Sequence, residues 1–446
     1  MKKPTKGVDA NELTVDQIRG IIVDNGAEPA VVDQFDEFVS RRRFFGLLGK
    51  GSAAAALVGI GAGSEAVLSG VFGRGMIPVA WAEEAAGEAP LTLEGKPGMN
   101  VYNLKPINGE YDAHMLDQDV TPIERHFVRN NGLVSERKDV QDWSLTIDGE
   151  VHTPLKLSFD ELKKFEQVSL VAPIECGGNG RGYFEPAVRG NQWKNGAIGC
   201  SKWTGVRLRD VLKKAGLKDS AVYTGHYGED PPIAGEAFSR GIPIDKAMEE
   251  HTIIAFAMND EPIPALHGYP VRLVVPGWIG SCSQKWLNRI WVRDKEHDSS
   301  KMVKTAYRVP PYPVTPGEKG PDGGWLVATS WPIKSMITSP AANGAAKAGE
   351  KVTVRGSAWA GEEKVDKVMV SMDFGATWTK ADLKKPANKY AWARFSTDVK
   401  FPSQGYYEVW AQAYDNKGRA QPFRQAWNPK GYMGNMVHRV PVMVSA

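Results

Sequence analysis

The stretch that decides the fold is Ala-Pro-Ile-Glu-Cys-Gly-Gly-Asn-Gly-Arg, residues 172–181. The apolar run at 168–174 predicts the end of a buried strand, which delivers Cys176 onto a tight turn. Glycine and asparagine tolerate positive φ, so the turn can fold closely around whatever the cysteine holds. A thiolate beside the guanidinium of Arg181 suits a soft metal and an anion. A lone cysteine on a turn is, however, more often an inert buried side chain.

Two other segments carry residue types that suit an anion. The segment Phe-Val-Arg-Asn-Asn-Gly at 127–132 predicts a short strand followed by a turn. His267 and Arg272 stand in Leu-His-Gly-Tyr-Pro-Val-Arg at 266–272, where a glycine and a proline predict a loop leading into a strand. Arginine can bind phosphate oxygens in pairs through its planar fork. By themselves these residues have plain alternatives: Arg129 can be a surface charge on its strand, and a single loop histidine is usually incidental.

Together the three segments resemble the sulfite oxidase family of molybdopterin oxidoreductases. The resemblance covers about residues 100–446. In that family the cysteine binds the molybdenum of the molybdopterin cofactor, so the resemblance implies that Cys176 is the metal ligand. It also implies an α+β sulfite-oxidase-type molybdopterin domain, followed by an all-β immunoglobulin-like sandwich.

The resemblance assigns roles to further residues. It implies catalytic roles for Arg129, Arg181, Tyr307 and Arg439. It implies cofactor contacts for Phe127, Val128, Arg129, Asn130, Asn131, Asp230, His267, Arg272, Ser283, Gln284 and Lys285. Two of these assignments have plain structural alternatives: Asp230 before two prolines can simply start a turn, and Arg439 can be an exposed charge near a C-terminal strand.

Two residues depart from the family pattern. Asn131 and Ser283 stand where histidines are usual in the family. Asparagine can donate a hydrogen bond but cannot carry a charge. We interpret the two replacements as an adjustment toward a substrate that is bulkier and less anionic than sulfite.

The sequence divides into three parts. Residues 1–82 contain Ser-Arg-Arg-Arg-Phe-Phe at 40–45, an Ala/Gly-rich apolar run at 51–63 and small residues at 80 and 82. This pattern predicts a cleaved twin-arginine signal for export of the folded protein to the periplasm, because the apolar run is too short for a membrane span. Residues 83–325 would form the catalytic domain. Residues 326–446, with short alternating strands, would form the sandwich as a dimerisation domain.

Composition excludes several classes of protein. A chain of 446 residues predicts two or three domains, and a net charge of +3 is too small to favour nucleic-acid binding. Three cysteines cannot build a disulfide framework. The chain contains no Cys-x-x-Cys-His, which argues against a c-type haem of its own, and no phosphate-binding P-loop motif.

The resemblance favours one function and leaves two others open. The favoured function is a molybdenum subunit that oxidises sulfane sulfur on a carrier protein and passes electrons to a dihaem cytochrome c subunit, within a homodimer or a heterotetramer. One alternative is a periplasmic sulfite:cytochrome c dehydrogenase. The other is a non-catalytic assembly subunit whose sandwich docks a partner.

Overall fold

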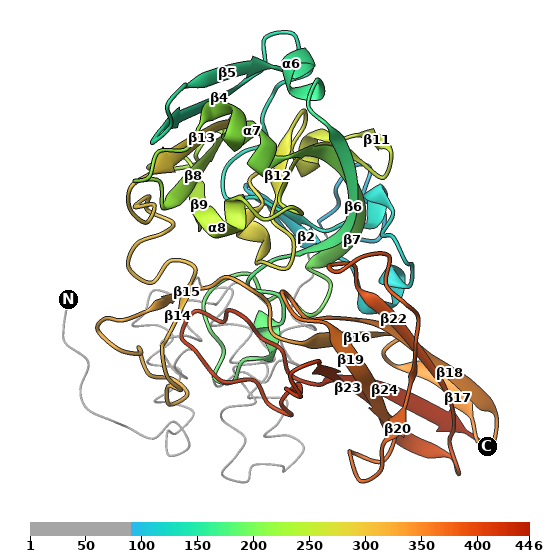
Figure 1. Cartoon of the computed structure of the whole chain (residues 1–446). Helices are drawn as coiled ribbons and strands as arrows, with labels where there is room; N and C mark the ends of the chain where they lie inside the picture. Colours follow the sequence, from blue (N-terminus) through green and yellow to red (C-terminus); the bar gives the residue numbers. More distant parts are fainter. Residues whose placement is uncertain (1–90) are drawn as a thin grey trace, which may run out of the picture. The chain divides into compact units, whose positions relative to one another are not determined.

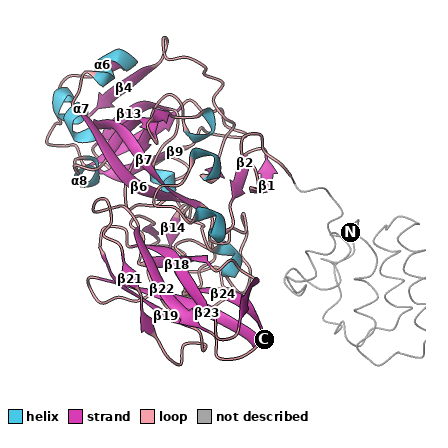
Figure 2. Cartoon of the chain, turned by 90° about the vertical axis from the view of Figure 1, so that its right-hand side faces the viewer, coloured by secondary structure: helices cyan, strands magenta, loops and turns pink. Residues whose placement is uncertain are grey.

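The computed structural model describes residues 91–446, so the export signal predicted at 1–82 lies outside the described residues. Figure 1 colours the described part along the sequence, and Figure 2 shows it from the side. The described residues belong to one structural unit. Among them, no helix has both the length and the apolar character that crossing a membrane requires.

The strand that carries the cysteine lies at the edge of an antiparallel sheet. Strand β6 (Gln167–Glu175) ends directly before Cys176, as the apolar run predicts. The sheet consists of β11 (Glu261–Pro262), β10 (Ile253–Met258), β7 (Ile198–Arg207) and β6, with β12 (Arg272–Val274) also paired to β10. The pairing places Ala255 opposite Arg272. One sheet therefore positions both the cysteine turn and the arginine of the second anion segment.

A second sheet lies beside the first and contains one parallel pair. Its order is β5 (Leu155–Ser158), β4 (Ser144–Gly149), β13 (Leu287–Arg293), β8 (Tyr223–Gly228) and β9 (Ser239–Pro243), and β13 runs parallel to β4. Among residues 91–446, the helices are α6 (Phe159–Lys163), α7 (Leu208–Ala215) and α8 (Ile244–Ala247). The sequence Ser-Phe-Asp-Glu at 158–161 has the spacing of a capping box, and Ser158 and Glu161 form one.

One local expectation was wrong. The sequence pattern at 203–216 predicts a loop that leads into a short amphipathic helix ending at glycine, but Trp203 lies inside strand β7 and is fully buried. The helix α7 does follow and ends at Gly216, as predicted. The strand continues because Trp203 packs in the core beneath β6, where its indole nitrogen donates to Ala172 O at 3.1 Å.

Short elements connect the two main sheets to the site. A small sheet contains β1 (Asn100–Leu104), β2 (Ile107–Glu110) and β3 (Val128–Arg129). Five 3-10 turns are described: η2 (Ala113–Leu116), η3 (Ile123–Arg125), η4 (Arg181–Tyr183), η5 (Ala265–His267) and η6 (Gly280–Cys282). A two-stranded ribbon of β14 (Arg308–Val309) and β15 (Leu326–Val327) precedes the C-terminal part.

The C-terminal part is a two-sheet sandwich, which confirms the all-β expectation (Figure 2). One sheet has the order β16 (Lys334–Ser339), β18 (Lys351–Trp359), β22 (Ala393–Lys400) and β21 (Asp382–Leu383). The other has β17 (Gly344–Lys347), β24 (His438–Ser445), β23 (Gly405–Asp415), β19 (Val365–Ser371) and β20 (Thr379–Lys380). Val354 and Phe395 of the first sheet share a core with Val368 and Val409 of the second.

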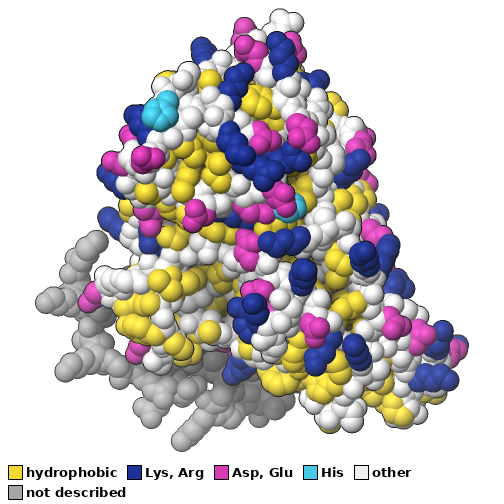
Figure 3. Space-filling model, viewed as in Figure 1, with side chains coloured by type: hydrophobic (Ala, Val, Ile, Leu, Met, Phe, Trp, Pro, Cys, Tyr) yellow, Lys and Arg dark blue, Asp and Glu magenta, His cyan; other side chains and the backbone are white. Residues whose placement is uncertain are grey.

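Charged side chains are mixed over the face drawn in Figure 3. Acidic and basic side chains are interspersed on this face, and neither positive nor negative charge covers a broad area. This distribution matches the small net charge of +3. On this face, therefore, the surface lacks the single-sign field that would attract a polyanion.

Candidate active site

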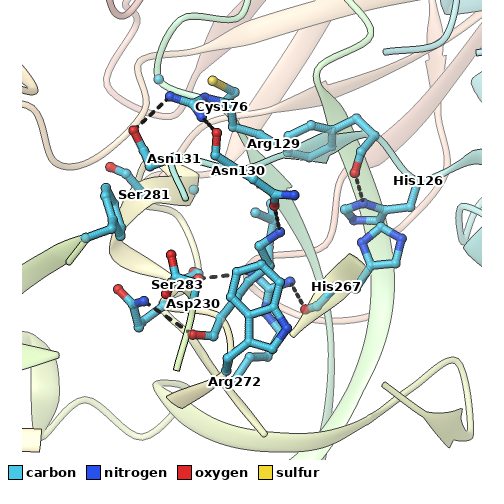
Figure 4. Close-up of a pocket in the computed structure, with 18 of the residues that line it drawn as sticks. His126, Arg129, Asn130, Asn131, Cys176, Asp230, His267, Arg272, Ser281 and Ser283 are labelled. Atoms are coloured by element: carbon cyan, nitrogen blue, oxygen red, sulfur yellow. Dashed lines mark hydrogen bonds between the residues drawn. The ribbon is translucent and has the colours of Figure 1, made fainter. Parts of the chain in front are cut away.

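A cavity lies between the cysteine turn and the two anion segments (Figure 4). Its lining contains His126, Phe127, Arg129, Asn130, Asn131, Ile174, Cys176, Gly177, Asp230, Phe238, His267, Arg272, Gly280, Ser281, Ser283, Gln284, Lys285, Trp286 and Tyr307. Thus Cys176 and nearly all of the residues predicted to hold the cofactor, from segments far apart in the sequence, meet in one place. Val128 is the exception, because its side chain is buried in the adjacent core.

The cysteine turn is held by backbone hydrogen bonds. Cys176 N donates to Ala197 O at 2.9 Å, and Asn179 N donates back to Cys176 O at 2.8 Å. Gly180 has φ of 90°, the left-handed conformation that the glycine-rich sequence predicts. The Cys176 side chain is half-buried and lines the cavity. The turn therefore presents the thiol to the cavity and shields it from most of the surrounding solvent.

The residue before the cysteine is fastened to the sandwich. Glu175 is 2% exposed, and its carboxylate accepts from Lys334 Nζ at 2.5 Å and from Trp359 Nε1 at 2.7 Å. The same carboxylate accepts from Asn179 Nδ2 at 2.9 Å, inside the turn. Since Lys334 and Trp359 belong to β16 and β18, the C-terminal sandwich directly supports the conformation of the cysteine turn.

The far end of the cavity carries buried cations. Arg272 Nη1 donates to His267 O at 2.8 Å and Nη2 donates to Ser283 O at 3.0 Å, so this guanidinium bonds to carbonyls. Burial lowers the pKa of Arg272 to about 9. Burial, followed by repulsion from Arg272, also holds the pKa of Lys285 well below its ordinary value. Both shifts show that the positive charges at this end are poorly compensated, which favours binding of an anion.

One carboxyl group faces these cations. Asp230 is 5% exposed, and burial raises its pKa to about 6 although the nearby Lys285 acts in the opposite direction. Its Oδ1 has no hydrogen-bond partner among the described residues. The carboxyl group therefore remains available to accept from a bound molecule.

Stability of the cofactor-free chain should depend on pH through Asp230. Its pKa is about 6 in the folded chain and 3.8 ordinarily, so the folded form holds this proton more tightly. The stability it adds at low pH is lost as pH rises through this window, by about 3 kcal/mol in total. Denaturant titrations from about pH 4 to 7 should show that loss in the wild type and not in Asp230→Asn. Identical pH profiles for the two proteins would contradict the assignment.

A polar chain links the middle of the cavity to Tyr307. Arg129 Nη2 donates to Asn131 Oδ1 at 3.0 Å, and Asn131 Nδ2 donates to the Tyr307 hydroxyl at 3.0 Å. Asn130 Oδ1 accepts from Lys285 Nζ. Asn131, which replaces the family's histidine, is therefore neutral but fully engaged between a guanidinium and a phenol.

Tyr307 is held by rings and charges on several sides. Its ring stacks on Tyr432 at 5.5 Å with an interplanar angle of 12°, and the Arg240 guanidinium lies 4.9 Å from its centroid. Phe238 meets it edge-on at 6.1 Å. The backbone φ of Tyr307 is 50°, which is uncommon for a bulky residue. This packing fixes where the hydroxyl group stands in the cavity.

Two predicted arginines lie outside the cavity lining. Arg181 donates to Lys430 O at 3.2 Å and Asn191 O at 3.2 Å, and its guanidinium lies 5.2 Å from the Tyr432 ring centroid. It therefore supports the wall behind Tyr307. Arg439 lies over Trp410 at 4.1 Å and donates to Phe423 O, in a separate surface hollow. The geometry gives Arg439 no access to the cavity that contains Cys176.

Sequence reasoning missed several residues at the site. Lys96 and His126 contact His267, Trp286 and Phe238 form part of the lining, and Tyr432 backs Tyr307. His126 directly precedes the Phe-Val-Arg segment, so its position in the sequence was a usable signal. No sequence signal marked Lys96 or Tyr432, since each lies far along the chain from the segments it contacts.

The cavity residues fit a molybdopterin-type group. Among the described residues, the donors Arg272 Nε and Asn130 Nδ2 and the acceptors Gln284 Oε1 and Asp230 Oδ1 are buried without a hydrogen-bond partner. Such atoms are costly unless a ligand completes them. A fused-ring heterocycle with both donors and acceptors, joined to a phosphate, would satisfy both kinds of atom. Cys176 at the opposite end offers a thiolate for a soft metal.

Comparisons with known proteins match two domain models and several sulfite oxidases. Residues 131–301 match the model of the oxidoreductase molybdopterin binding domain, and residues 327–445 match that of the Mo-co oxidoreductase dimerisation domain. The chain is 32% identical to chicken (Gallus gallus) sulfite oxidase over 77% of each chain. It is 33% identical to mouse (Mus musculus) mitochondrial sulfite oxidase over 78% of this chain, and spans 66% of that relative's length. The chain belongs to the sulfite oxidase family of molybdopterin oxidoreductases.

A solved structure extends this comparison. The fold is similar to that of the sulfane dehydrogenase SoxCD from Paracoccus pantotrophus, with a TM-score of 0.65 and 27% sequence identity. The match covers 84% of this chain and 92% of the solved chain. The match therefore spans both the molybdopterin-type part and the sandwich, in agreement with the fold expected from the sequence.

Proposed function

We propose that this chain is the molybdenum subunit of a periplasmic sulfane dehydrogenase, in which Cys176 binds the metal. The observation that carries the proposal is the cavity itself, which has a thiol at one end and poorly compensated cations at the other. When bound, the cofactor supplies two-electron redox chemistry at molybdenum. Similarity to SoxCD favours sulfane sulfur as the substrate class.

Different residues of the cavity would bind the cofactor and the substrate. Arg272 and Lys285 would hold the phosphate of the cofactor, and Asp230 and Gln284 would accept from its ring nitrogens. Arg129, which lines the same cavity as Cys176, would attract the anionic sulfur of the substrate and orient it. The Tyr307 hydroxyl, held by Asn131, would hold a proton at this position. Phe127 and Trp286 would exclude water from the same space.

The partners belong to the proposal. The electrons would pass to a dihaem cytochrome c subunit, and the substrate sulfur would arrive on a carrier protein. The sandwich would form a homodimer or a heterotetramer with the cytochrome, after export through the twin-arginine pathway. The matched dimerisation domain and the SoxCD similarity support this arrangement.

The electron yield separates the two catalytic alternatives. Oxidation of a carrier-bound persulfide to a thiosulfonate takes three oxygen atoms from three waters and releases six electrons and six protons. Oxidation of sulfite to sulfate takes one oxygen atom and releases two electrons and two protons. The protein should be purified with its native cytochrome and electrons counted per sulfur atom. A count of six supports the proposal, whereas reduction of cytochrome by free sulfite alone, at two electrons, supports a sulfite dehydrogenase.

The non-catalytic alternative has its own test, which is metal analysis of the purified chain. A purified chain without molybdenum, or with molybdenum that persists in Cys176→Ser, would favour an assembly subunit. Because molybdenum content does not depend on the substrate, it tests the non-catalytic alternative before any turnover is measured.

Replacing Asn131 by histidine should shift substrate preference toward sulfite. A histidine here can add positive charge beside Arg129, which strengthens attraction of a small dianion. We expect the ratio of sulfite to sulfane turnover to rise about tenfold, equivalent to about 1.4 kcal/mol. Steady-state kcat/KM for both substrates measures the ratio. An unchanged ratio would remove Asn131 from the account of specificity.

Replacing Arg272 by methionine should empty the cavity of cofactor. The variant loses a buried positive charge and the unpartnered Nε donor of Arg272. Hydrogen bonds to charged groups contribute about 1.5–3 kcal/mol each, so we expect at least about a tenfold fall in molybdenum per chain. Arg289→Met is the matched control, since Arg289 pairs with Asp148 outside the cavity lining. Full molybdenum content in Arg272→Met would contradict the assignment.

A further inference from the structure

A buried lysine outside both matched segments contacts the cation-rich end of the cavity. Lys96 precedes β1 and is 5% exposed. Its ammonium group reaches three acceptors: Ile123 O at 2.5 Å, His126 O at 3.0 Å and His267 Nε2 at 2.8 Å. Within residues 91–446 it has no carboxylate within salt-bridge distance. Burial lowers the pKa of Lys96 to about 7, and attraction from Glu124 acts in the opposite direction.

The three contacts fix the protonation of His267. An ammonium group has three N–H donors and no acceptor, and each donor here has one acceptor in reach. When Lys96 is charged, His267 Nε2 therefore accepts from it, and the His267 proton is on Nδ1. Burial and the surrounding cations hold the pKa of His267 well below its ordinary value, so the ring is neutral. His267 is thus a neutral ring with a single N–H.

The remaining neighbours are consistent with this state. His126 meets the His267 ring edge-on at 5.0 Å, and burial lowers the pKa of His126 to about 3, so it adds no charge. The His267 carbonyl is already used by Arg272. Among the described residues, the Nδ1 atom makes no hydrogen bond, and the ring lines the cavity. Its N–H is therefore available to a ligand.

We propose that Lys96 is a positioning residue that fixes His267 as an Nδ1–H donor toward an anionic group in the cavity. The ligand class is a phosphate ester, held jointly by His267, Arg272 and Lys285. This inference rests on the proposed function only for the identity of that ester. A lysine that merely tethered the chain at 123–126 would leave the tautomer of His267 unchanged.

Histidine NMR of the full-length chain tests the tautomer. The chain contains eight histidines, so selective ¹⁵N-histidine labelling gives a tractable spectrum, and His267→Gln assigns the signal. Below about pH 7, where Lys96 is charged, we expect the wild type to have a protonated Nδ1 and an unprotonated Nε2. Lys96→Met, of similar length but without a donor, should shift His267 to the Nε2–H form or to a mixture. Lys96→Arg, which keeps a donor, should restore the wild-type signal.

Binding of inorganic phosphate gives a second readout. Calorimetry on the full-length cofactor-free chain should show about tenfold weaker phosphate binding for Lys96→Met than for the wild type. The matched control is Lys246→Met, a buried lysine paired with Glu362 and Tyr390 away from the cavity lining, which should bind phosphate as the wild type does.

Three outcomes would overturn the inference. They are a wild-type His267 protonated on Nε2, a tautomer unchanged in Lys96→Met, or equal loss of phosphate binding in Lys96→Met and Lys246→Met. The first uses the unmodified protein, so a variant that fails to fold does not block the test. If the tautomer holds and the chain contains no molybdenum, the proposed function fails and this inference stands. If His267 is protonated on Nε2 while sulfur oxidation proceeds, this inference fails and the proposed function stands.

Discussion

Cys176→Ser is expected to fold normally and to hold at most about a hundredth of the wild-type molybdenum, with sulfur oxidation lost in proportion. Serine keeps the size of the side chain but replaces a soft thiolate by a weakly acidic hydroxyl group. Replacing residues that only support metal ligands already costs about 10–100-fold in metal affinity, so losing the protein ligand should cost at least as much. Elemental analysis of the purified protein measures the metal, and circular dichroism measures the fold.

A second cysteine provides the control for this experiment. Cys200 is fully buried, and burial raises the pKa of its thiol to about 12, so it remains a neutral thiol in the core. Cys200→Ser should therefore retain its molybdenum. Equal molybdenum loss in the two variants would indicate a general folding defect. Full retention in Cys176→Ser would contradict the role of Cys176.

Lys334→Met is expected to lower the free energy of unfolding by about 3–5 kcal/mol. The change leaves the Glu175 carboxylate buried without its cationic partner, and breaking a buried ion pair from one side typically has this cost. Lys334 and Glu175 are 5% and 2% exposed at the side chain, so water cannot replace the lost ammonium. Denaturant titration of the cofactor-free chain measures the difference.

An exposed ion pair of the same sandwich is the matched control. Lys351 pairs with Asp398, and their side chains are 64% and 47% exposed. Lys351→Met should change stability by less than about 1 kcal/mol, because water screens such pairs. Adding Glu175→Gln to Lys334→Met should recover part of the loss, since the uncompensated charge is removed. A Lys334→Met variant as stable as Lys351→Met would show that the Glu175 contact contributes little.

Much of the site could be predicted from the sequence because its segments are local. The strand β6, the turn at Cys176 and the loop at His267 each consist of consecutive residues whose chemistry is readable in order. The two-sheet sandwich was predictable for the same reason, since its strands alternate in short runs. The resemblance also implied a role for Tyr307, which lies in the cavity lining.

Contacts across the fold could not be predicted in this way. The bond between Lys334 and Glu175 joins residues 159 positions apart, and the bond between Lys96 and His267 joins residues 171 positions apart. No local pattern marks either lysine. The resemblance implied a catalytic role for Arg439, with an exposed charge as the alternative; its guanidinium lies over Trp410, where a ring offers a favourable surface for the charge.

The central claim is that Cys176 binds molybdenum at the mouth of a cation-rich cavity. Anomalous X-ray scattering from crystals of the purified protein, collected at the molybdenum absorption edge, tests it most directly. The account predicts one strong peak at bonding distance from Cys176 Sγ, inside the cavity lined by Arg129 and Tyr307. A crystal with no molybdenum peak, or with a peak away from this cysteine, would contradict it.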